Sequence, residues 1–385
     1  MALELRKFKE QAVFVGVQSA MGTPATVFNF LSVESGQLDA EAAAKIELKD
    51  IQPSYSKQGM INVGAKYSGS YDLTFRPSGV DGGNIPISLA VSPLLQASGL
   101  IESTGKILNV STSASFLVGE TVQDSGSTAT TGMVYGVATG KLFLKNVSGT
   151  FSTSSTVLGL DSASTSTIST VSPSLVYALN SSIGSAKYAT IKHNIGGVQE
   201  LATDVQCNVK ITAKDSDVAR INIGNILGIY SDPTTVSLGA ISCPAKDPIK
   251  VNPLMVVWGA YDSTVFVVES MDVDLGNTVS EVNDAKNSSS ITAVKIEDRN
   301  PKITLSMSAP QLASFNPFEN ANTNVKQAIS FGLNLNGNAG ERVMMHANAA
   351  QWEYPKKKDV KGVVYYDING MLTGCNDNEF VLTVF

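Results

Sequence analysis

Apolar and polar residues alternate along most of this chain in short runs, and such alternation is typical of half-buried β-strands. Phe14–Gln18, Tyr71–Phe75 and Val265–Leu275 are examples. Glycine, proline, asparagine and serine lie between the runs and predict turns there. The pattern therefore predicts a mainly β protein that is built from many short strands.

Two stretches depart from this alternation and predict one short helix in each half of the chain. Ile87–Ala97 is the candidate in the first half, because Gly99 suits the position that follows a last helical turn. Pro93 would have to lie in the first turn of that helix or kink it, since proline has no N–H to donate. In the second half, Pro310–Asn320 is predicted to be helical in part.

Similar segments recur in the two halves around the only two histidines. His193 lies late in a strand-like stretch and precedes Asp204 by 11 residues. His346 lies late in a second such stretch and precedes Asp359 by 13 residues. We interpret these stretches as corresponding parts of a duplicated β module.

Two further pairs of segments support the duplication. Ile46–Asp50 resembles Met271–Leu275, and a polar loop is predicted after each. Tyr71–Phe75 resembles Ile303–Met307 in its alternation, and a proline follows each shortly afterwards. Duplicated modules can build pseudo-symmetric rings, so the repetition favours a structural role over catalysis.

Residues 101–173 differ from the rest of the chain, with 28 serines and threonines and only seven charged residues among 73. Apolar alternation in Phe116–Val122 and Lys141–Val147 argues against a disordered linker. Phe151–Gly159 reads as another copy of the Phe116 segment, and Asp161–Thr170 is predicted to be a loop. We predict a small, solvent-facing, all-β domain that is inserted into the first module.

This insertion divides the predicted modules. Residues 1–100 form the first part of module one, residues 174–235 form its second part, and residues 236–385 form module two. The chain has 385 residues and is 43% hydrophobic, which suffices for several cores. We expect no secretion signal and no membrane segment, and free thiols at Cys207, Cys243 and Cys375.

The net charge of −6 argues against a nucleic-acid-binding surface, which would show clustered lysine and arginine. A mildly negative protein is nevertheless suited to line a channel through which DNA slides without sticking.

The residue patterns predict no enzymatic activity, no cofactor and no metal site. His193 and His346 are interpreted as partly buried strand residues, because no nucleophile-elbow spacing accompanies either. The acidic pairs Asp215–Asp217 and Asp272–Asp274 lack the glycine and distal glutamate of a calcium loop. Lys356–Lys358 is interpreted as a solvated hairpin loop.

Several segments together resemble the tail tube proteins, or major tail proteins, of bacteriophages with long non-contractile tails, the siphophages. They occur in a characteristic order and cover most of the chain outside residues 101–173. They are Gly22–Pro24, Gly64–Gly79, Pro93–Leu100, Leu275–Val279, Asp298–Pro301 and Asp377–Val384.

The resemblance implies β-sandwich or small-barrel modules, each with a flanking helix, that join edge to edge into a ring around a continuous inner barrel. Single-module tube proteins form hexameric rings, so two modules per chain imply a homotrimer with pseudo-sixfold symmetry. The inserted domain would project outward, which fits a sheathless tail. In this family the loop between the second and third strands contacts the next ring. By position, these contacts are Gln52, Pro53, Ser54, Tyr55 and Lys57, together with Asn277, Glu281, Asn283, Asp284 and Lys286.

The resemblance also implies a virion protein that is made in the bacterial cytoplasm and serves DNA ejection. Its partners would be further copies of itself, the tape measure protein and phage DNA in the lumen, and the tail terminator and tail-tip proteins. Two alternatives remain open. One is a tail-tip or baseplate ring protein, and the other is a carbohydrate-binding or adhesive module on a β scaffold. A glycan hydrolase would need carboxylates paired across a cleft, and the spacing of the acidic residues shows no such pair.

Overall fold

The computed structural model describes residues 11–48, 59–237, 241, 246–252, 254–259, 261–262, 265, 267–287, 289–374 and 377–385. Antiparallel strands dominate this part of the chain, which also contains two short α-helices. The predicted mainly β fold is therefore confirmed.

The first repeat is a set of strands in which β1 pairs with β13, β13 with β14, β14 with β15, β15 with β6, and β6 with β3. A short strand, β2, pairs with β1, and a separate hairpin of β4 and β5 connects β3 to β6. The bounds are β1 Gln11–Val17, β2 Asn29–Leu31, β3 Val33–Glu41, β4 Ala44–Glu47, β5 Met60–Val63, β6 Lys66–Thr74, α1 Ser92–Ala97, β13 Ala189–Ile195, β14 Val198–Lys214 and β15 Arg220–Thr235.

The second repeat pairs its strands in the order β16, β22, β23, β25, β21 and β18. A short strand, β17, pairs with β16, and a separate hairpin of β19 and β20 connects β18 to β21. The bounds are β16 Met255–Trp258, β17 Tyr261–Asp262, β18 Val268–Asp274, β19 Asn277–Asn283, β20 Ile291–Arg299, β21 Lys302–Ser308, α2 Pro317–Asn322, β22 Lys326–Leu333, β23 Val343–Trp352, β24 Lys356–Val360, β25 Val363–Thr373 and β26 Val381–Val384.

The two repeats thus share one strand order, both in space and along the chain. In each, a helix lies between the third and fourth main strands. Their irregularities also coincide, since β13 shifts register against β14 between Ala189 and Ile191, and β22 shifts against β23 between Gln327 and Ile329. Shared bulges of this kind identify Ile191 with Ile329 and align the rest of the two repeats.

This alignment corrects most of the correspondences that the sequence had suggested. His193 lies on β13 and matches Phe331 of β22, whereas His346 lies on β23 and matches Leu201 of β14. The histidines are therefore not equivalent. Ile46 and Met271 also lie on strands of different rank, β4 and β18.

Only the segments that begin at Tyr71 and Ile303 fall on equivalent strands, β6 and β21, with Tyr71 matching Leu305. Alternation has a period of two, so a shift of two residues preserves the pattern and leaves the register undetermined.

The first helix is shorter than expected, and the second stretch is helical in part, as predicted. Only Ser92–Ala97 of the first candidate is α-helical, with Pro93 in the first turn and Gly99 at φ +89°. The second helix begins at Pro317. Asn316, the residue before it, accepts a hydrogen bond at Oδ1 from Glu319 N. Asparagine is a favoured N-cap, which explains this start.

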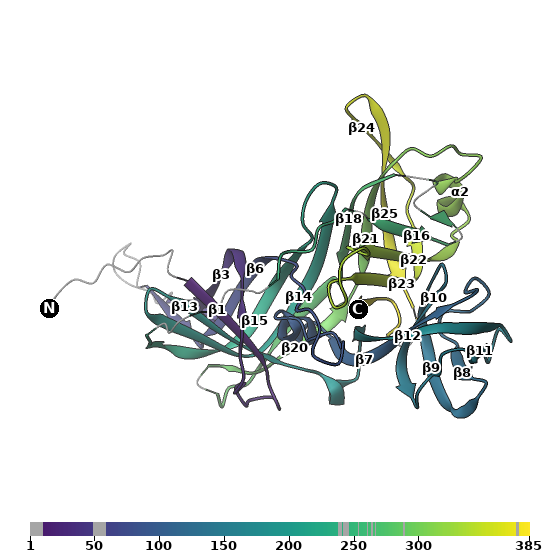
Figure 1. The fold of residues 1–385 in the computed structure, drawn as a ribbon. Helices are drawn as coiled ribbons and strands as arrows, with labels where there is room; N and C mark the ends of the chain where they lie inside the picture. The colour runs from purple at the N-terminus through teal and green to yellow at the C-terminus, as the bar shows by residue number, and fades with distance from the viewer. Residues whose placement is uncertain are drawn as a thin grey trace.

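Residues between α1 and β13 form a second β structure, visible as the blue-green strands at the lower right of Figure 1. A compact core lies entirely within it and contains Phe116, Phe151 and Ile168. Phe116 and Phe151 each precede a strand, and these strands, β8 and β11, pair with each other. The bounds are β7 Leu100–Val110, β8 Thr121–Asp124, β9 Ser127–Ala138, β10 Lys141–Ser148, β11 Thr156–Gly159 and β12 Thr165–Leu179.

One expectation for this insert needs correction. The predicted loop Asp161–Thr170 is wrong in its second half, because β12 begins at Thr165. The insert packs against the second repeat on one side. Tyr135 donates to or accepts from Thr383 at 2.7 Å between the two hydroxyls, and Phe143 lies 4.6 Å from the His346 ring between centroids.

Candidate assembly interface

Among the described strands, the two repeats pair through β14 of the first and β18 of the second. Lys210–Lys214 of β14 runs antiparallel to Ser270–Asp274 of β18, with Lys210 opposite Asp274. Lys210 Nζ also lies 3.2 Å from Asp272 Oδ2. The acidic pair Asp272–Asp274 therefore belongs to this join, and one continuous sheet spans both repeats.

A hairpin of the second repeat, β19–β20, reinforces the join by packing across β14 and β15 of the first. Its buried apolar side chains include Ile291 and Val294, each 1% exposed. At its base, Asn277 is 2% exposed and donates Nδ2 to the carbonyl oxygens of Ser98 (2.9 Å) and Cys207 (3.1 Å). The hairpin is thus fixed to the helix end and to the long strand of the other repeat.

The far end of the hairpin is held more weakly. Lys66 Nζ lies 2.8 Å from Glu281 Oε2, and both side chains are about one fifth exposed. The backbone N of Ala65 donates to the carbonyl oxygen of Ser289 at 3.2 Å. A partly exposed ion pair contributes little, on the order of 0–1 kcal/mol, so most of the stabilisation comes from the buried base.

The structure describes only the second of the two predicted ring-contact segments. Gln52, Pro53, Ser54, Tyr55 and Lys57 lie outside the described residues. The polar loop predicted after Met271–Leu275 is wrong for its first half, because residues 277–283 form strand β19.

Within that segment, Asn277 is buried and Glu281 is engaged by Lys66 of the same chain. Asn283 and Lys286 are exposed, and Asp284 Oδ1 accepts a hydrogen bond from Lys286 N at 2.9 Å in the turn. Asn277 is therefore enclosed within the chain, whereas Asn283, Asp284 and Lys286 lie at the end of β19 and in the turn that follows, and contact with the next ring stays a prediction. Polar alternation in a loop and in a half-covered strand looks alike, which explains the error.

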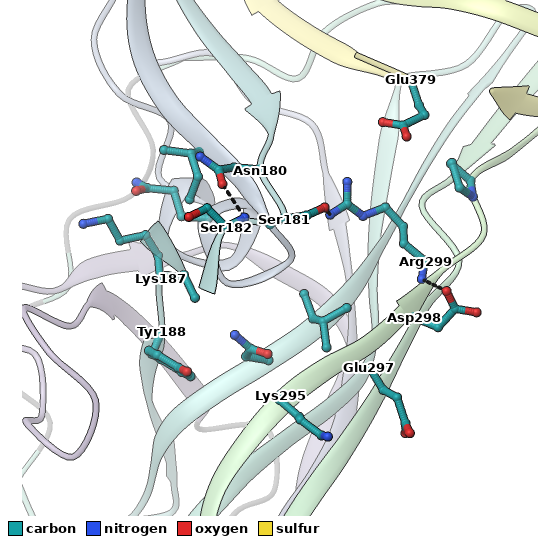
Figure 2. A pocket seen from close by; sticks show the side chains of 17 residues that line it. Asn180, Ser181, Ser182, Lys187, Tyr188, Lys295, Glu297, Asp298, Arg299 and Glu379 are labelled. Atoms are coloured by element: carbon teal, nitrogen blue, oxygen red, sulfur yellow. Dashed lines mark hydrogen bonds between the residues drawn. The ribbon is translucent and has the colours of Figure 1, made fainter. Parts of the chain in front are cut away.

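A pocket of about 510 Å³ lies where both repeats and the insert meet, and Figure 2 shows its lining. Arg299, from the end of β20, donates Nη2 to Ser181 Oγ at 3.0 Å. Asp377 accepts from the Ser181 backbone N at 2.8 Å and lies 3.7 Å from Arg299 Nη1. Arg299, Ser181 and Asp377 therefore form one polar cluster, which links Asp298–Pro301 with the segment that begins at Asp377.

The two histidines are buried structural residues. His193 Nδ1 lies 3.2 Å from Tyr71 Oη, and burial lowers the pKa of His193 to about 4. His346 Nδ1 lies 2.8 Å from Ser330 Oγ, and burial lowers the pKa of His346 to about 3. Both rings lie on strands inside the protein and form their hydrogen bonds with side chains of the same chain.

The remaining candidates also have local structural roles. Asp217 Oδ2 accepts from Arg220 Nη1, and Asp215 Oδ1 accepts from Asn252 Nδ2 at 2.8 Å. The lysines at 356–358 form strand β24 instead of a loop. Cys207 is a buried free thiol, while Cys243 and Cys375 lie outside the described residues.

Comparison with known proteins gives no match to a family model and no match to a curated protein. In the part of the chain that the structure describes, no helix combines the length and apolarity needed to cross a membrane. Among the same residues, no three histidine, cysteine, aspartate or glutamate side chains come together as a metal site would require.

Proposed function

We propose that this chain is the structural subunit of a phage tail tube, which self-assembles into stacked rings and forms the conduit for DNA. The observation that carries the proposal is the β14–β18 join. Through it, two repeats with the same strand order belong to one sheet. Repeats that join in this manner extend a sheet around an axis, and closing the circle leaves no exposed strand edges.

The number of chains in a ring follows from the repeat. Each chain contributes two modules, so three chains supply six modules and form a pseudo-sixfold ring. The join within each chain then provides three of the six contacts between modules. A similar contact between neighbouring chains provides the other three.

The resemblance supplies the partners of the proposed tube. Phage DNA and the tape measure protein would occupy the lumen, and the tail terminator and tail-tip proteins would bind the two ends. The chain would be made in the bacterial cytoplasm and would act in the virion. The net charge of −6 supports a lumen that does not retain DNA.

Electron microscopy of the purified protein over a range of concentrations tests the proposal. We expect rings or tubes with threefold symmetry and knobs at the positions of the insert. Rings with six identical subunits would retain the tube and refute the two-module count. A protein that stays monomeric at every concentration, also in the presence of tail-tip complexes as initiators, would refute the proposed function.

A further inference from the structure

The strand that forms the join in the first repeat has a counterpart in the second. In β14, the N-terminal half pairs with β13, and the end, Lys210–Lys214, pairs with β18 of the other repeat. In the second repeat, β23 pairs with β22, and β24 then continues alongside β25 as the end of β14 does alongside β15. Strand β24 therefore occupies the place of Lys210–Lys214.

The other half of the join also has a counterpart, because β18 and β3 hold the same place in their repeats. Strand β18 shifts register against β21 between Val268 and Ser270, and β3 shifts against β6 between Val33 and Ser35. Counting from these bulges, Asp39 matches Asp274. The registers through β21 and β25 likewise match Lys356 with Lys210.

Both counterparts have an unused edge in the single chain. Among the described residues, β24 pairs only with β25 and β3 pairs only with β6. The two strands lie far apart in Figure 1, with β24 at the top and β3 at the left, so they cannot meet within one chain. An exposed edge strand is a template for pairing with another chain.

The charges of the two edges are opposite. Strand β24 begins with Lys356, Lys357 and Lys358, all exposed, whereas β3 carries the exposed acids Asp39 and Glu41. Lysines on an edge usually prevent pairing between identical edges, because like charges repel. An acidic edge as the partner converts this repulsion into attraction and selects a head-to-tail contact.

Apolar exposure on the neighbouring hairpin supports the same contact. Hairpin β4–β5 holds the place in the first repeat that β19–β20 holds in the second. Ile46, Met60 and Ile61 of that hairpin are 52%, 61% and 51% exposed, although Ile291 and Val294 of β19–β20 are buried. Exposed apolar residues grouped on one element mark a surface that another protein covers.

We infer that β24 of one copy pairs antiparallel with β3 of the next copy, with Lys356 opposite Asp39, and that hairpin β4–β5 then packs across β23 and β25 of that neighbour. The partner is a second copy of this chain, and the contact repeats the β14–β18 join. This inference rests on the proposed self-assembly and specifies the surfaces that carry it.

Disulfide trapping tests the register. Residues directly opposite in an antiparallel pair have Cα atoms about 4.5–5.5 Å apart, within the range of a disulfide. Oxidation of a chain with Lys356→Cys and Asp39→Cys should give covalent dimers and a closed trimer on a denaturing gel. A chain with Lys356→Cys and Ser35→Cys is the matched control, because four residues displace the partner by about 13 Å. The unmodified chain controls for the native cysteines.

Charge reversal tests the attraction. Either Lys356→Glu or Asp39→Lys should raise the concentration needed for assembly by about tenfold or more, since each places like charges in contact. The double variant should restore assembly, because the swapped charges meet between chains. Lys361→Glu, in the turn that follows β24, is the control and should assemble like the unmodified chain. Circular dichroism checks that each variant is folded.

The outcomes separate this inference from the proposed function. Either of two results would overturn the β24–β3 contact and would not refute the tail tube. One is that rings form without more disulfide-linked dimers than the control pair gives, and the other is that assembly is unaffected by the charge changes. Trapped dimers without rings or tubes at any concentration would support the contact and refute the tube.

Discussion

Asn277 donates its side-chain Nδ2 to the carbonyl oxygen of Ser98, so the first residue of the β19–β20 hairpin caps the end of α1 in the other repeat. The same amide reaches Cys207 O, and the backbone N of Asn277 donates to Asn208 Oδ1 at 2.9 Å. One buried side chain thus ties a helix, a strand and a hairpin across the join.

Replacing Asn277 with alanine should destabilise the chain by about 2–3 kcal/mol, because two buried carbonyl acceptors would lose their donor and a small cavity would form. Chemical denaturation at equilibrium measures this loss. Asn283→Ala, at the exposed end of the same strand, is the matched control and should change the free energy of unfolding by less than about 0.5 kcal/mol. Equal effects of the two substitutions would contradict the anchoring role of Asn277.

His346 should make the chain less stable in acid. Burial lowers its pKa in the folded state from 6.5 to about 3, so the unfolded chain binds the proton first as the pH falls. Stability from this group is complete above about pH 6.5 and is lost toward pH 3, by up to about 1.4 kcal/mol for each pH unit. His346→Leu, which installs the residue of the matching position Leu201, should flatten this part of the profile. Denaturation midpoints between pH 7 and pH 4.5 measure the slope, and an unchanged slope would contradict the assignment.

The sequence predicted the fold class and failed on the repeat register, and one physical reason accounts for both results. Alternation reports which face a residue occupies, and that face is the same for Tyr71 and for a residue two positions away. Bulges such as the one between Ala189 and Ile191 fix the register, but they leave no composition signal of their own. The two histidines were matched because they are the only ones in the chain, but a rare residue type does not make two positions equivalent.

The candidate interface was predictable only in outline. The sequence predicted that the segment after Met271–Leu275 contacts the next ring. In the structure this segment begins as strand β19, whose first residue, Asn277, is hydrogen-bonded to the end of α1. Burial of Asn277 depends on Ser98 and Cys207, which lie far away in sequence. The lysines at 356–358 did carry a signal, because three lysines on an edge strand mark an edge that must be kept from pairing with itself.

Gly136 permits the insert to approach the second repeat. A Cβ atom at this position would lie 2.5 Å from Nδ1 and Cε1 of the His346 ring, which is too close for any real contact. Gly136→Ala should therefore lower the free energy of unfolding by about 1–3 kcal/mol through overpacking. Gly82→Ala is the control, since nothing lies within 4 Å of its added Cβ. Thermal unfolding of both variants checks the prediction, and a neutral Gly136→Ala would show that the insert can move away without cost.

Hairpin β4–β5 offers a test that separates assembly from folding. Ile61 is 51% exposed, so Ile61→Asp should leave the stability of the single chain nearly unchanged. If the hairpin packs on the next copy, the same substitution buries a charge there and should raise the concentration needed for assembly by about tenfold or more. Ile85→Asp is the matched control, because Ile85 is 45% exposed on a turn away from the hairpin. Sedimentation velocity over a concentration series measures both variants. Identical assembly of the two would mean that this apolar surface stays uncovered in the ring.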